Sequence, residues 1–325
     1  MQLILNKKGA RLKVKDGLFV VRSGDDEQLI PPGKVRSIVM QPATSLSHEA
    51  VRLATTQEAE ILFVDESGFP FARLWSPRFG SISTIRKNQV HFARSASGLE
   101  WVREMLMRKL ENQTVILSLL QPDSPALLPA LQEAISQIEG YREKIFRLEA
   151  ESPGEAAPSL RGLEGNSGRI YFQTLSACLP EAYQFEKRSR RPAEDMFNAL
   201  LNYAYGMLYG MVEGALIKAG LDPYLGVFHR DEYKRPVLAF DFIEPFRIWA
   251  EYVVIRLCME QAIFVEYFDR EQGGYWLNPD GKRLLIHAMN DYLGEVVDLR
   301  GLSRSRQVHV ELEAQALAQT LKEEG

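Results

Sequence analysis

The chain has 325 residues, more than one hydrophobic core usually supports, so one large domain or two ordinary domains are expected. With 46% hydrophobic and 25% charged residues, its composition is that of an ordinary soluble globular protein. The net charge of −4 argues against a surface coated with phosphate-binding side chains, although it allows local basic patches.

Cysteine usage and the N-terminus indicate the compartment. Cys178 and Cys258 both lie in apolar helical patterns, which disfavours a disulfide framework or a cysteine-ligated zinc site. The N-terminus has no long apolar run behind a basic start, and no stretch of about 18 apolar residues occurs. We therefore expect a cytoplasmic protein without a signal peptide or membrane span.

The first 80 residues have the pattern of a small β domain. Short apolar runs between glycine, proline and charged turns predict strands at residues 3–5, 18–21, 35–40, 61–65 and 69–74. A single helical segment, residues 47–59, interrupts the strands, and Ser47 is its predicted N-cap.

Beyond Ser83 the pattern becomes helical. Apolar residues recur near the 3.6-residue spacing at Trp101, Met105, Leu106, Leu110 and Leu117, and again at Ile135, Ile138, Ile145 and Leu148. Residues 151–160, rich in proline and glycine, predict a loop between two helices. We predict an α+β fold with a small β-rich N-terminal domain at residues 1–80 and a larger all-α domain at residues 81–325.

Three glycines distinguish the segment R-G-L-E-G-N-S-G-R-I-Y-F, residues 161–172. Gly162, Gly165 and Gly168 recur at every third position of a predicted helix, where each costs about 0.5–1 kcal/mol relative to alanine. This cost indicates close approach of another backbone, either a neighbouring helix or a nucleic-acid strand. Glu164 lies among them, with Tyr171 on or near its face. Taken alone, the segment also fits a tightly packed helix with Glu164 at the surface.

A second long helix is predicted to open with R-R-P-A-E-D-M-F and to stop at Gly220. Its polar stripe steps by four, four, three and four residues through Glu194, Asn198, Asn202, Tyr205 and Tyr209. Because asparagine is a poor residue for a helix interior, the two asparagines indicate hydrogen bonding into a cleft or across a helix interface, rather than a solvated face.

Basic side chains cluster in two places. The run K-R-S-R-R at residues 187–191 fits either a phosphate-binding segment or a charged loop. The cations of the first long helix are interpreted as a solvated face; they are Arg86, Lys87, Arg94, Arg103, Arg108 and Lys109.

Residues 226–247, G-V-F-H-R-D-E-Y-K-R-P-V-L-A-F-D-F-I-E-P-F-R, place a histidine ahead of two carboxylates. Asp241 and Glu244, three residues apart, would share one helix face. A turn through residues 230–236 would bring them to His229 as ligands of a divalent cation. The same stretch also fits a helix capped by Asp241, with Glu244 and Pro245 in its first turn.

Four motifs in order resemble those of the CRISPR-associated spacer-acquisition integrase family, the universal Cas-one endonuclease. They are R-G-L-E-G-N-S-G-R-I-Y-F, R-R-P-A-E-D-M-F-N-A-L-L-N-Y-A-Y-G, G-V-F-H-R and D-F-I-E-P-F-R. Any one motif would be weak evidence, but all four in the right order and spacing are specific. The resemblance covers essentially the whole chain.

The resemblance implies a metal-dependent DNA endonuclease and integrase that inserts short foreign DNA fragments, or spacers, into a CRISPR array by phosphodiester transesterification. It implies a divalent cation, Mg²⁺ or Mn²⁺, whose glutamate, histidine and acidic ligands match Glu164, His229 and Glu244. Many members carry aspartate where Glu244 stands. Asp241 matches a further acidic position, as an accessory ligand or supporting group. Asn198, Asn202 and Tyr171 are expected to support the site.

The residue types suit this chemistry. Phosphodiester exchange needs charge neutralised on the phosphoryl oxygens and an activated attacking oxygen, and a bound divalent cation supplies both. Glutamates are hard oxygen ligands, and His229 tilts the preference towards Mn²⁺ without excluding Mg²⁺. The imidazole also fits a proton shuttle.

The resemblance further implies partners. These are double-stranded and branched DNA, a second copy of the chain in a homodimer formed through the N-terminal domain, and a bridging dimer of the second universal protein, Cas-two. DNA binding requires local cations. The candidate phosphate contacts are Arg161, Arg169, Lys187, Arg188, Arg190, Arg191 and Arg247.

Two other functions remain open. A non-enzymatic DNA-binding scaffold on the same fold would have no need for the full set Glu164, His229 and Glu244. An RNA-directed nuclease would use the same ligands, but no RNP-like aromatic pattern, zinc-finger spacing or P-loop occurs. The remaining histidines are predicted to make surface or interhelical hydrogen bonds; they are His48, His91, His287 and His309.

Overall fold

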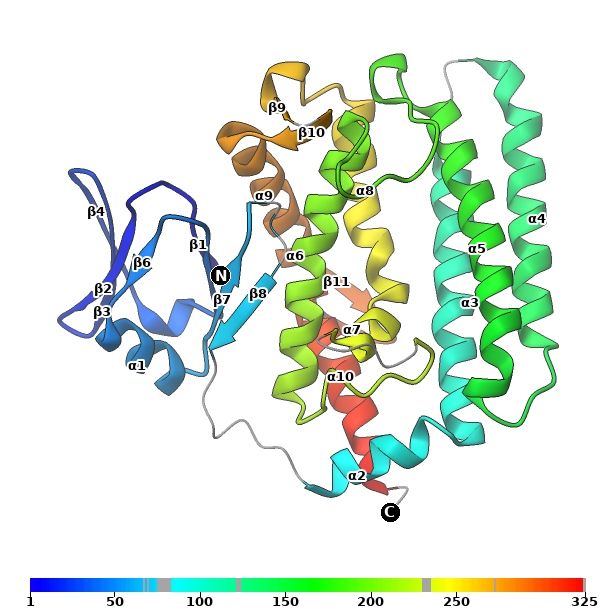
Figure 1. Ribbon diagram of the computed structural model, residues 1–325, viewed down its shortest axis with the longest axis horizontal. Coiled ribbons are helices and arrows are strands. Elements are labelled where there is room, and N and C mark those ends of the chain that lie inside the picture. The colour runs from blue at the N-terminus through cyan, green and yellow to red at the C-terminus, as the bar shows by residue number, and fades with distance from the viewer. Residues whose placement is uncertain are drawn as a thin grey trace. The chain divides into compact units, whose positions relative to one another are not determined.

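The computed structural model describes residues 1–66, 68, 70–74, 83–120, 124–229, 235–271 and 273–323. The chain divides into two compact units, Met1–Gly80 and Ser81–Gly325. The first contains two sheets and a helix, and the second is mostly helical (Figure 1). The predicted α+β class is confirmed, with one correction. The second unit is not all-α, because it also contains two β-hairpins.

The first unit is built on two four-stranded sheets. One has the order β1 (Gln2–Leu5), β5 (Ser37–Met40), β7 (Glu60–Val64) and β8 (Pro70–Leu74), with the first three strands parallel and β8 antiparallel to β7. The other has the order β4 (Asp26–Ile30), β3 (Leu18–Ser23), β2 (Arg11–Lys15) and β6 (Ser45–Leu46). All five predicted strands are present; Phe69, in the fifth, lies outside the described residues.

Helix α1 (His48–Thr56) completes the first unit. Ser47 caps it as predicted, because its side chain accepts a hydrogen bond from the Ala50 amide at 3.2 Å. Side chains of both sheets, including Leu12 and Ile38, form one buried cluster with Ala50 and other residues of α1. Burial of this apolar surface holds the unit together.

The second unit contains most of the helices. They are α2 (Ser83–Phe92), α3 (Ala96–Leu119), α4 (Leu128–Phe146), α5 (Pro153–Cys178), α6 (Met196–Lys218), α7 (Val237–Phe242), α8 (Arg247–Met259), α9 (Pro279–Gly294) and α10 (Arg306–Glu323). The hairpins are β9 (Phe268–Glu271) with β10 (Gly274–Leu277), and β11 (Val296–Leu299) with β12 (Leu302–Ser305). Short 3-10 turns lie at η1 (Pro32–Lys34), η2 (Pro125–Leu127), η3 (Glu181–Tyr183), η4 (Glu244–Phe246) and η5 (Val265–Tyr267).

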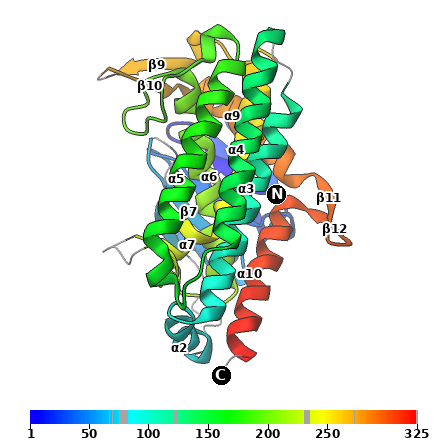
Figure 2. The ribbon, with the colours of Figure 1, turned by 90° about the vertical axis from the view of Figure 1, so that its right-hand side faces the viewer.

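Helices α3, α4 and α5 pack side by side, and α6 packs against α8 (Figures 1 and 2). Helix α3 also contacts α8 and η4, so the middle of α3 faces both α5 and the α7–α8 junction. This meeting of three chain segments positions the candidate site.

The prediction of a loop at residues 151–160 is wrong. Helix α5 begins at Pro153, capped by Ser152, whose side chain accepts a hydrogen bond from the Glu155 amide. Proline is well suited to the first helical position, where its missing N–H has no partner to lose. Pro158, further along, gives up only the single bond to the carbonyl four residues earlier. Proline and glycine here mark the start of a helix rather than a break.

Helix α6 ends beside Gly220 as predicted, but it begins at Met196, so Glu194 of the predicted polar stripe lies before it. Asp195 caps it by accepting from the Asn198 amide at 2.7 Å, and beyond its last residue Gly220 adopts a positive φ of 85°. Glycine takes this left-handed conformation without steric cost. Among the described helices, none is both long and apolar enough to cross a membrane.

Candidate active site

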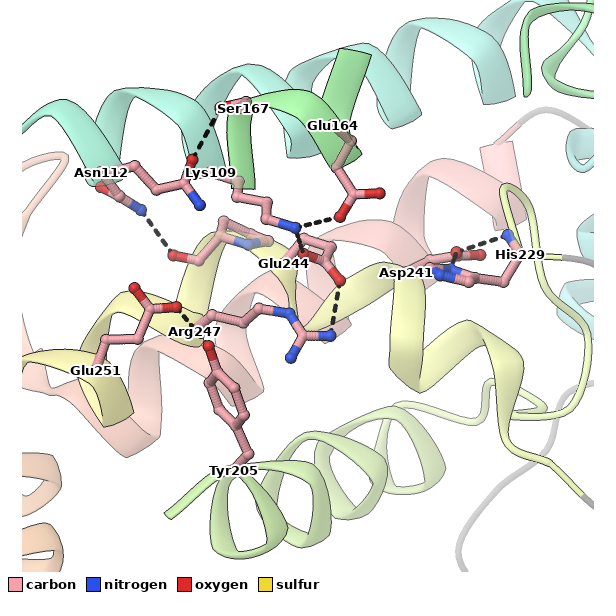
Figure 3. Close-up of polar contacts among 12 residues, drawn as sticks. Lys109, Asn112, Glu164, Ser167, Tyr205, His229, Asp241, Glu244, Arg247 and Glu251 are labelled. Carbon is pink, nitrogen blue, oxygen red and sulfur yellow. Dashed lines mark hydrogen bonds and ion pairs between the residues drawn. The ribbon is translucent and has the colours of Figure 1, made fainter. Parts of the chain in front are cut away.

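Two glutamates from different elements converge on one lysine (Figure 3). Glu164 lies in α5, and Glu244 opens η4 between α7 and α8. The Lys109 ammonium, from α3, contacts Glu164 Oε1 and lies 2.6 Å from Glu244 Oε2. The side chains of Lys109 and Glu244 are only 12% and 4% exposed, so water screens their charges weakly.

Arg247 is the second cation on Glu244. Its Nη2 donates to Glu244 Oε1 at 2.9 Å and to the Tyr209 hydroxyl at 2.7 Å. The guanidinium also lies over the rings of Tyr205 and Tyr209, 4.9 and 5.4 Å from their centroids. These contacts hold the Arg247 guanidinium in one position against the Glu244 carboxylate.

The charges set the protonation states of the cluster. Burial alone would raise the pKa of Glu244, but Arg247 and Lys109 outweigh it and hold the pKa at about 2. Burial alone would lower the pKa of Lys109, but Glu244 and Glu164 outweigh that effect and raise it. Glu244 is therefore a carboxylate and Lys109 an ammonium at neutral pH.

Asp241 organises the loop that carries His229. Its Oδ2 accepts from the Val227 and Phe228 amides at 2.7 and 3.0 Å. Its Oδ1 accepts from the His229 amide at 2.9 Å and lies 2.5 Å from His229 Nδ1. The interpretation of Asp241 as a helix cap is wrong, because α7 begins at Val237 and the carboxylate binds the preceding loop instead.

The Asp241 contact defines the His229 ring. Because an ionised carboxylate only accepts hydrogen bonds, Nδ1 carries the proton and the neutral ring presents Nε2 as a lone pair. Burial lowers the pKa of His229, but the hydrogen bond to Asp241 and the carboxylates of Asp241, Glu244 and Glu164 outweigh it, so the pKa is raised. Residues 230–236, expected to form the turn, are described only at 235 and 236.

The structure brings together two of the three predicted ligands. Glu164 and Glu244 share a cation, whereas His229 lies to one side with Asp241 (Figure 3). Within the described ranges, no three His, Cys, Asp or Glu side chains lie close enough to hold a metal ion together. Glu244 Oε2 is nevertheless buried without a hydrogen bond of regular geometry, and its contact is the ion pair with the Lys109 ammonium 2.6 Å away. This oxygen, with a second carboxylate and an imidazole nearby, fits a divalent cation.

The two asparagines of α6 hold the basic segment 187–191. Asn198 is fully buried; its Oδ1 accepts from Arg188 and from the Ser189 amide, and its Nδ2 donates to the Lys187 carbonyl at 2.9 Å. Asn202 Nδ2 donates to the Ser189 and Arg190 carbonyls at 3.0 and 2.9 Å. Both asparagines make hydrogen bonds, as predicted, but with this loop rather than into a cleft or across a helix interface.

The candidate phosphate contacts fall into two groups. Arg188 and Arg247 are engaged inside the chain, Arg188 by both asparagines and by the rings of Phe172 and Tyr205. Arg161 is half-buried beside the Phe228 ring. The exposed members of the set are Arg169, Lys187, Arg190 and Arg191.

Tyr171 is buried, and its hydroxyl donates to Glu251 Oε2 at 2.8 Å rather than reaching Glu164. Tyr205 donates to the other oxygen of Glu251 at 2.5 Å, so Glu251 ties α5 and α6 to α8. Burial and the charge of Glu251 raise the pKa of both tyrosines. Both phenols therefore stay protonated and keep donating.

Sequence reasoning missed Lys109 and Glu251. The interpretation of Lys109 as part of a solvated face is wrong, since its ammonium is buried between two glutamates. A signal was available: Lys109 lies four residues after Met105 and four before Gln113, both buried, so it continues the inward stripe of α3. Glu251 carried a weaker signal, as a carboxylate between the apolar residues 248–250 and 252–255 of α8.

The glycine-spaced face of α5 is not packed against a helix. A Cβ added at Gly162, Gly165 or Gly168 would meet nothing within 4 Å. The interpretation of these glycines as a face for tight helix packing is therefore wrong. The alternative, approach of a nucleic-acid strand beside Glu164, remains a prediction.

Removing the buried anchor of the basic loop should destabilise the protein. We expect Asn198→Ala to lower the free energy of unfolding by about 2–4 kcal/mol, because the Lys187 carbonyl, the Ser189 amide and Arg188 all lose a partner. Urea denaturation measures the change. Asn166→Ala, at an exposed position of α5, is the control and should change stability by less than about 0.5 kcal/mol. An equal effect of the two substitutions would contradict the anchoring role.

Comparison with known proteins identifies the family. The family model described as CRISPR associated protein Cas1 matches residues 3–291. The chain belongs to the Cas1 family. The resemblance inferred from the four motifs is thereby confirmed.

Cas1 relatives match along most of the chain. A protein of Archaeoglobus fulgidus named CRISPR-associated endonuclease Cas1 1 is 28% identical over 313 residues, covering 93% of this chain and 90% of the relative. The protein of that name from Thermus thermophilus is 29% identical over 324 residues, covering 99% and 96%.

Solved structures share the Cas1 fold. A Cas1 protein from Thermotoga maritima superimposes with a TM-score of 0.81 at 20% identity, covering 99% of this chain and 97% of that chain. A casposase bound to integration product gives a TM-score of 0.81 at 21% identity, covering 100% and 91%. At these identities the likeness establishes the fold alone.

Proposed function

We propose that this Cas1 family member is a divalent-metal-dependent DNA endonuclease and integrase that inserts short DNA fragments into a CRISPR array. The observation that carries the proposal is the convergence of Glu164 and Glu244, from α5 and η4, in a poorly solvated cluster beside His229. Support also comes from relatives named as endonucleases and from the fold shared with a casposase bound to integration product.

Glu164, Glu244 and His229 Nε2 would hold Mg²⁺ or Mn²⁺. When bound, such an ion neutralises charge on the phosphoryl oxygens and activates the attacking oxygen. That oxygen is a DNA 3′-hydroxyl in integration and water in cleavage. Asp241 keeps the proton on His229 Nδ1, so the imidazole presents its other nitrogen to the reaction. Arg247 keeps Glu244 ionised and oriented.

The surroundings of the cluster suit a nucleic-acid backbone. The uncovered glycine face of α5 lets a strand approach the helix near Glu164 without meeting side chains. Exposed cations on α5 and on the loop 187–191, which Asn198 and Asn202 hold in shape, would contact phosphates. The chain's net negative charge leaves these local cations as the electrostatic basis for DNA binding.

We further propose that the chain forms a homodimer through its β-rich N-terminal unit and joins a bridging Cas2 dimer. A solved structure described as a Cas6-RT-Cas1–Cas2 complex shares the fold with a TM-score of 0.82 at 21% identity, where this chain covers 35% of that longer chain. A partner that shares the DNA would also offset the net negative charge of this chain.

The test uses the purified protein and labelled branched DNA with Mn²⁺, Mg²⁺ or EDTA. We expect cleavage or joining of the DNA with either metal and none with EDTA. In a second arm, unlabelled array-like DNA receives a labelled fragment with Cas2 present, and the joined product is sequenced. Tight, salt-sensitive DNA binding with intact DNA under both metals would contradict the proposal and favour the scaffold function.

A further inference from the structure

Lys109 occupies the position between the two glutamates that an added cation would take. Its ammonium contacts Glu164 Oε1 and Glu244 Oε2 at once, and both carboxylates turn towards it (Figure 3). The sequence separations are large, 55 residues from Lys109 to Glu164 and 133 from Asn112 to Pro245, so the arrangement is a product of the tertiary fold.

The carboxylates need a positive charge between them. Two like charges that face one another in a weakly solvated place repel strongly, and each disfavours ionisation of the other. Lys109 relieves this repulsion. It therefore lets Glu164 and Glu244 lie close together, with Arg247 as the second cation on Glu244.

Lys109, rather than Arg247, is the cation free to leave. Arg247 is fixed by the Tyr209 hydroxyl and by two aromatic rings as well as by Glu244. Within the part of the chain that the structure describes, the Lys109 ammonium has only the two carboxylates as partners. It is carried on a flexible four-carbon stem, which can swing while α3 stays fixed.

The backbone around Lys109 is held firmly. Asn112 Nδ2 donates to the Pro245 carbonyl at 2.8 Å, and Gln113 Oε1 accepts from the Ser167 hydroxyl at 3.1 Å. These bonds join α3 to η4 and to α5 one turn beyond Lys109. Withdrawal of the ammonium is thus a change of one side chain that leaves both glutamates where they are.

We propose that Lys109 is a positioning residue that holds the divalent-cation position between Glu164 and Glu244, so that metal binds by displacing its ammonium. An ion coordinated by these oxygens at about 2.0–2.2 Å leaves no room for an ammonium on the same atoms. The inference rests on the proposed function, since it concerns the same acidic pair. It adds that metal affinity is set by competition with a residue of the chain.

The test measures Mn²⁺ binding without DNA, by isothermal titration calorimetry and by the free Mn²⁺ signal in electron paramagnetic resonance. Lys109→Met keeps the stem length and removes the charge. We expect Mn²⁺ to bind at least about tenfold more tightly to Lys109→Met than to the unaltered protein, because no ammonium has to be displaced. We also expect Mn²⁺ to raise the melting temperature of Lys109→Met by more than it raises that of the unaltered protein.

The control is Lys218→Met. Lys218 lies on α6 and pairs with Glu311 of α10 at 3.3 Å, so its replacement should leave the Mn²⁺ affinity unchanged. Adding Glu164→Gln to Lys109→Met should return the affinity to the unaltered value or below. A purely structural role for Lys109 predicts the opposite sign: weaker Mn²⁺ binding in Lys109→Met. Weaker or unchanged binding would overturn the inference.

If circular dichroism shows that Lys109→Met does not fold, Lys109→Gln decides, since its amide still donates to a carboxylate without carrying charge. The inference fails if neither the unaltered protein nor a folded Lys109 variant binds Mn²⁺. Tighter Mn²⁺ binding in the variant together with intact DNA under every metal would sustain the inference and reject the integrase function.

Discussion

Replacing His229 with alanine should reduce metal-dependent DNA cleavage and joining by about 10³-fold or more. The imidazole is either a ligand or a proton carrier, and loss of a positioned general acid or base alone costs about 10²–10⁴-fold. Its ring is oriented by Asp241 at 2.5 Å, and the charges of Glu244 and Glu164 contribute to the raised pKa of the imidazole. Single-turnover rates at saturating Mn²⁺, with labelled branched DNA, measure the loss.

His287→Ala is the matched control. His287 is an exposed histidine of α9 whose Nδ1 lies 3.4 Å from Asp291, an arrangement that mimics the histidine–aspartate contact away from the site. Its removal should leave the rate within about twofold of the unaltered protein. A His229→Ala protein that is folded and as active as the His287→Ala protein would remove His229 from the reaction.

Replacing Asp241 with alanine should lower the free energy of unfolding by about 3–5 kcal/mol. One buried carboxylate accepts three backbone N–H groups and the imidazole, and alanine accepts none of them. Each donor left without a partner costs about 1–3 kcal/mol, in proportion to its burial. Chemical denaturation of the second unit, followed by tryptophan fluorescence, measures the change.

Asp280→Ala is the control for Asp241→Ala, because Asp280 is exposed and its carboxylate pairs with the exposed Arg283, at 3.2 Å. That substitution should cost less than about 1 kcal/mol. Asp241→Asn should fall between the two, since its amide oxygen still accepts while its NH₂ faces the remaining donors. A loss below about 1 kcal/mol for Asp241→Ala would show that the loop is held by other contacts.

The sequence allowed the prediction of elements whose residues share one pattern. Apolar runs predicted β1, β3, β5, β7 and β8, and Ser47 and Gly220 marked helix ends through their own backbone chemistry. Strand β2 has no apolar run, although its alternation R-L-K-V-K is itself a strand pattern, and β4 gave little signal because four of its five residues are exposed. Both strands are stabilised by pairing with β3, and the turn Asp16-Gly17 between β2 and β3, with both residues at positive φ, was a local hairpin signal.

The sequence predicted the acidic residues of the candidate site, but it did not predict which cations contact them. Glu164 and Glu244 carry the family motifs, but the partner that joins them belongs to a third helix. Lys109 looked like one of six cations on a long helix, and only the packing of α3 against α5 and η4 distinguishes it. Arg188 likewise belonged to a basic run, yet its place beside Asn198 depends on how the loop folds back onto α6.

The wide spacing of Lys109, Glu164 and Glu244 along the chain has a consequence during synthesis. The ribosome delivers α3 and α5 first, and Glu244 follows Glu164 by a further 80 residues, after α6 and α7. A nascent chain that stops before η4 has Lys109 and Glu164 but lacks the second carboxylate. The acidic pair therefore assembles late, and a fragment released early from translation has only one of the two carboxylates that face Lys109.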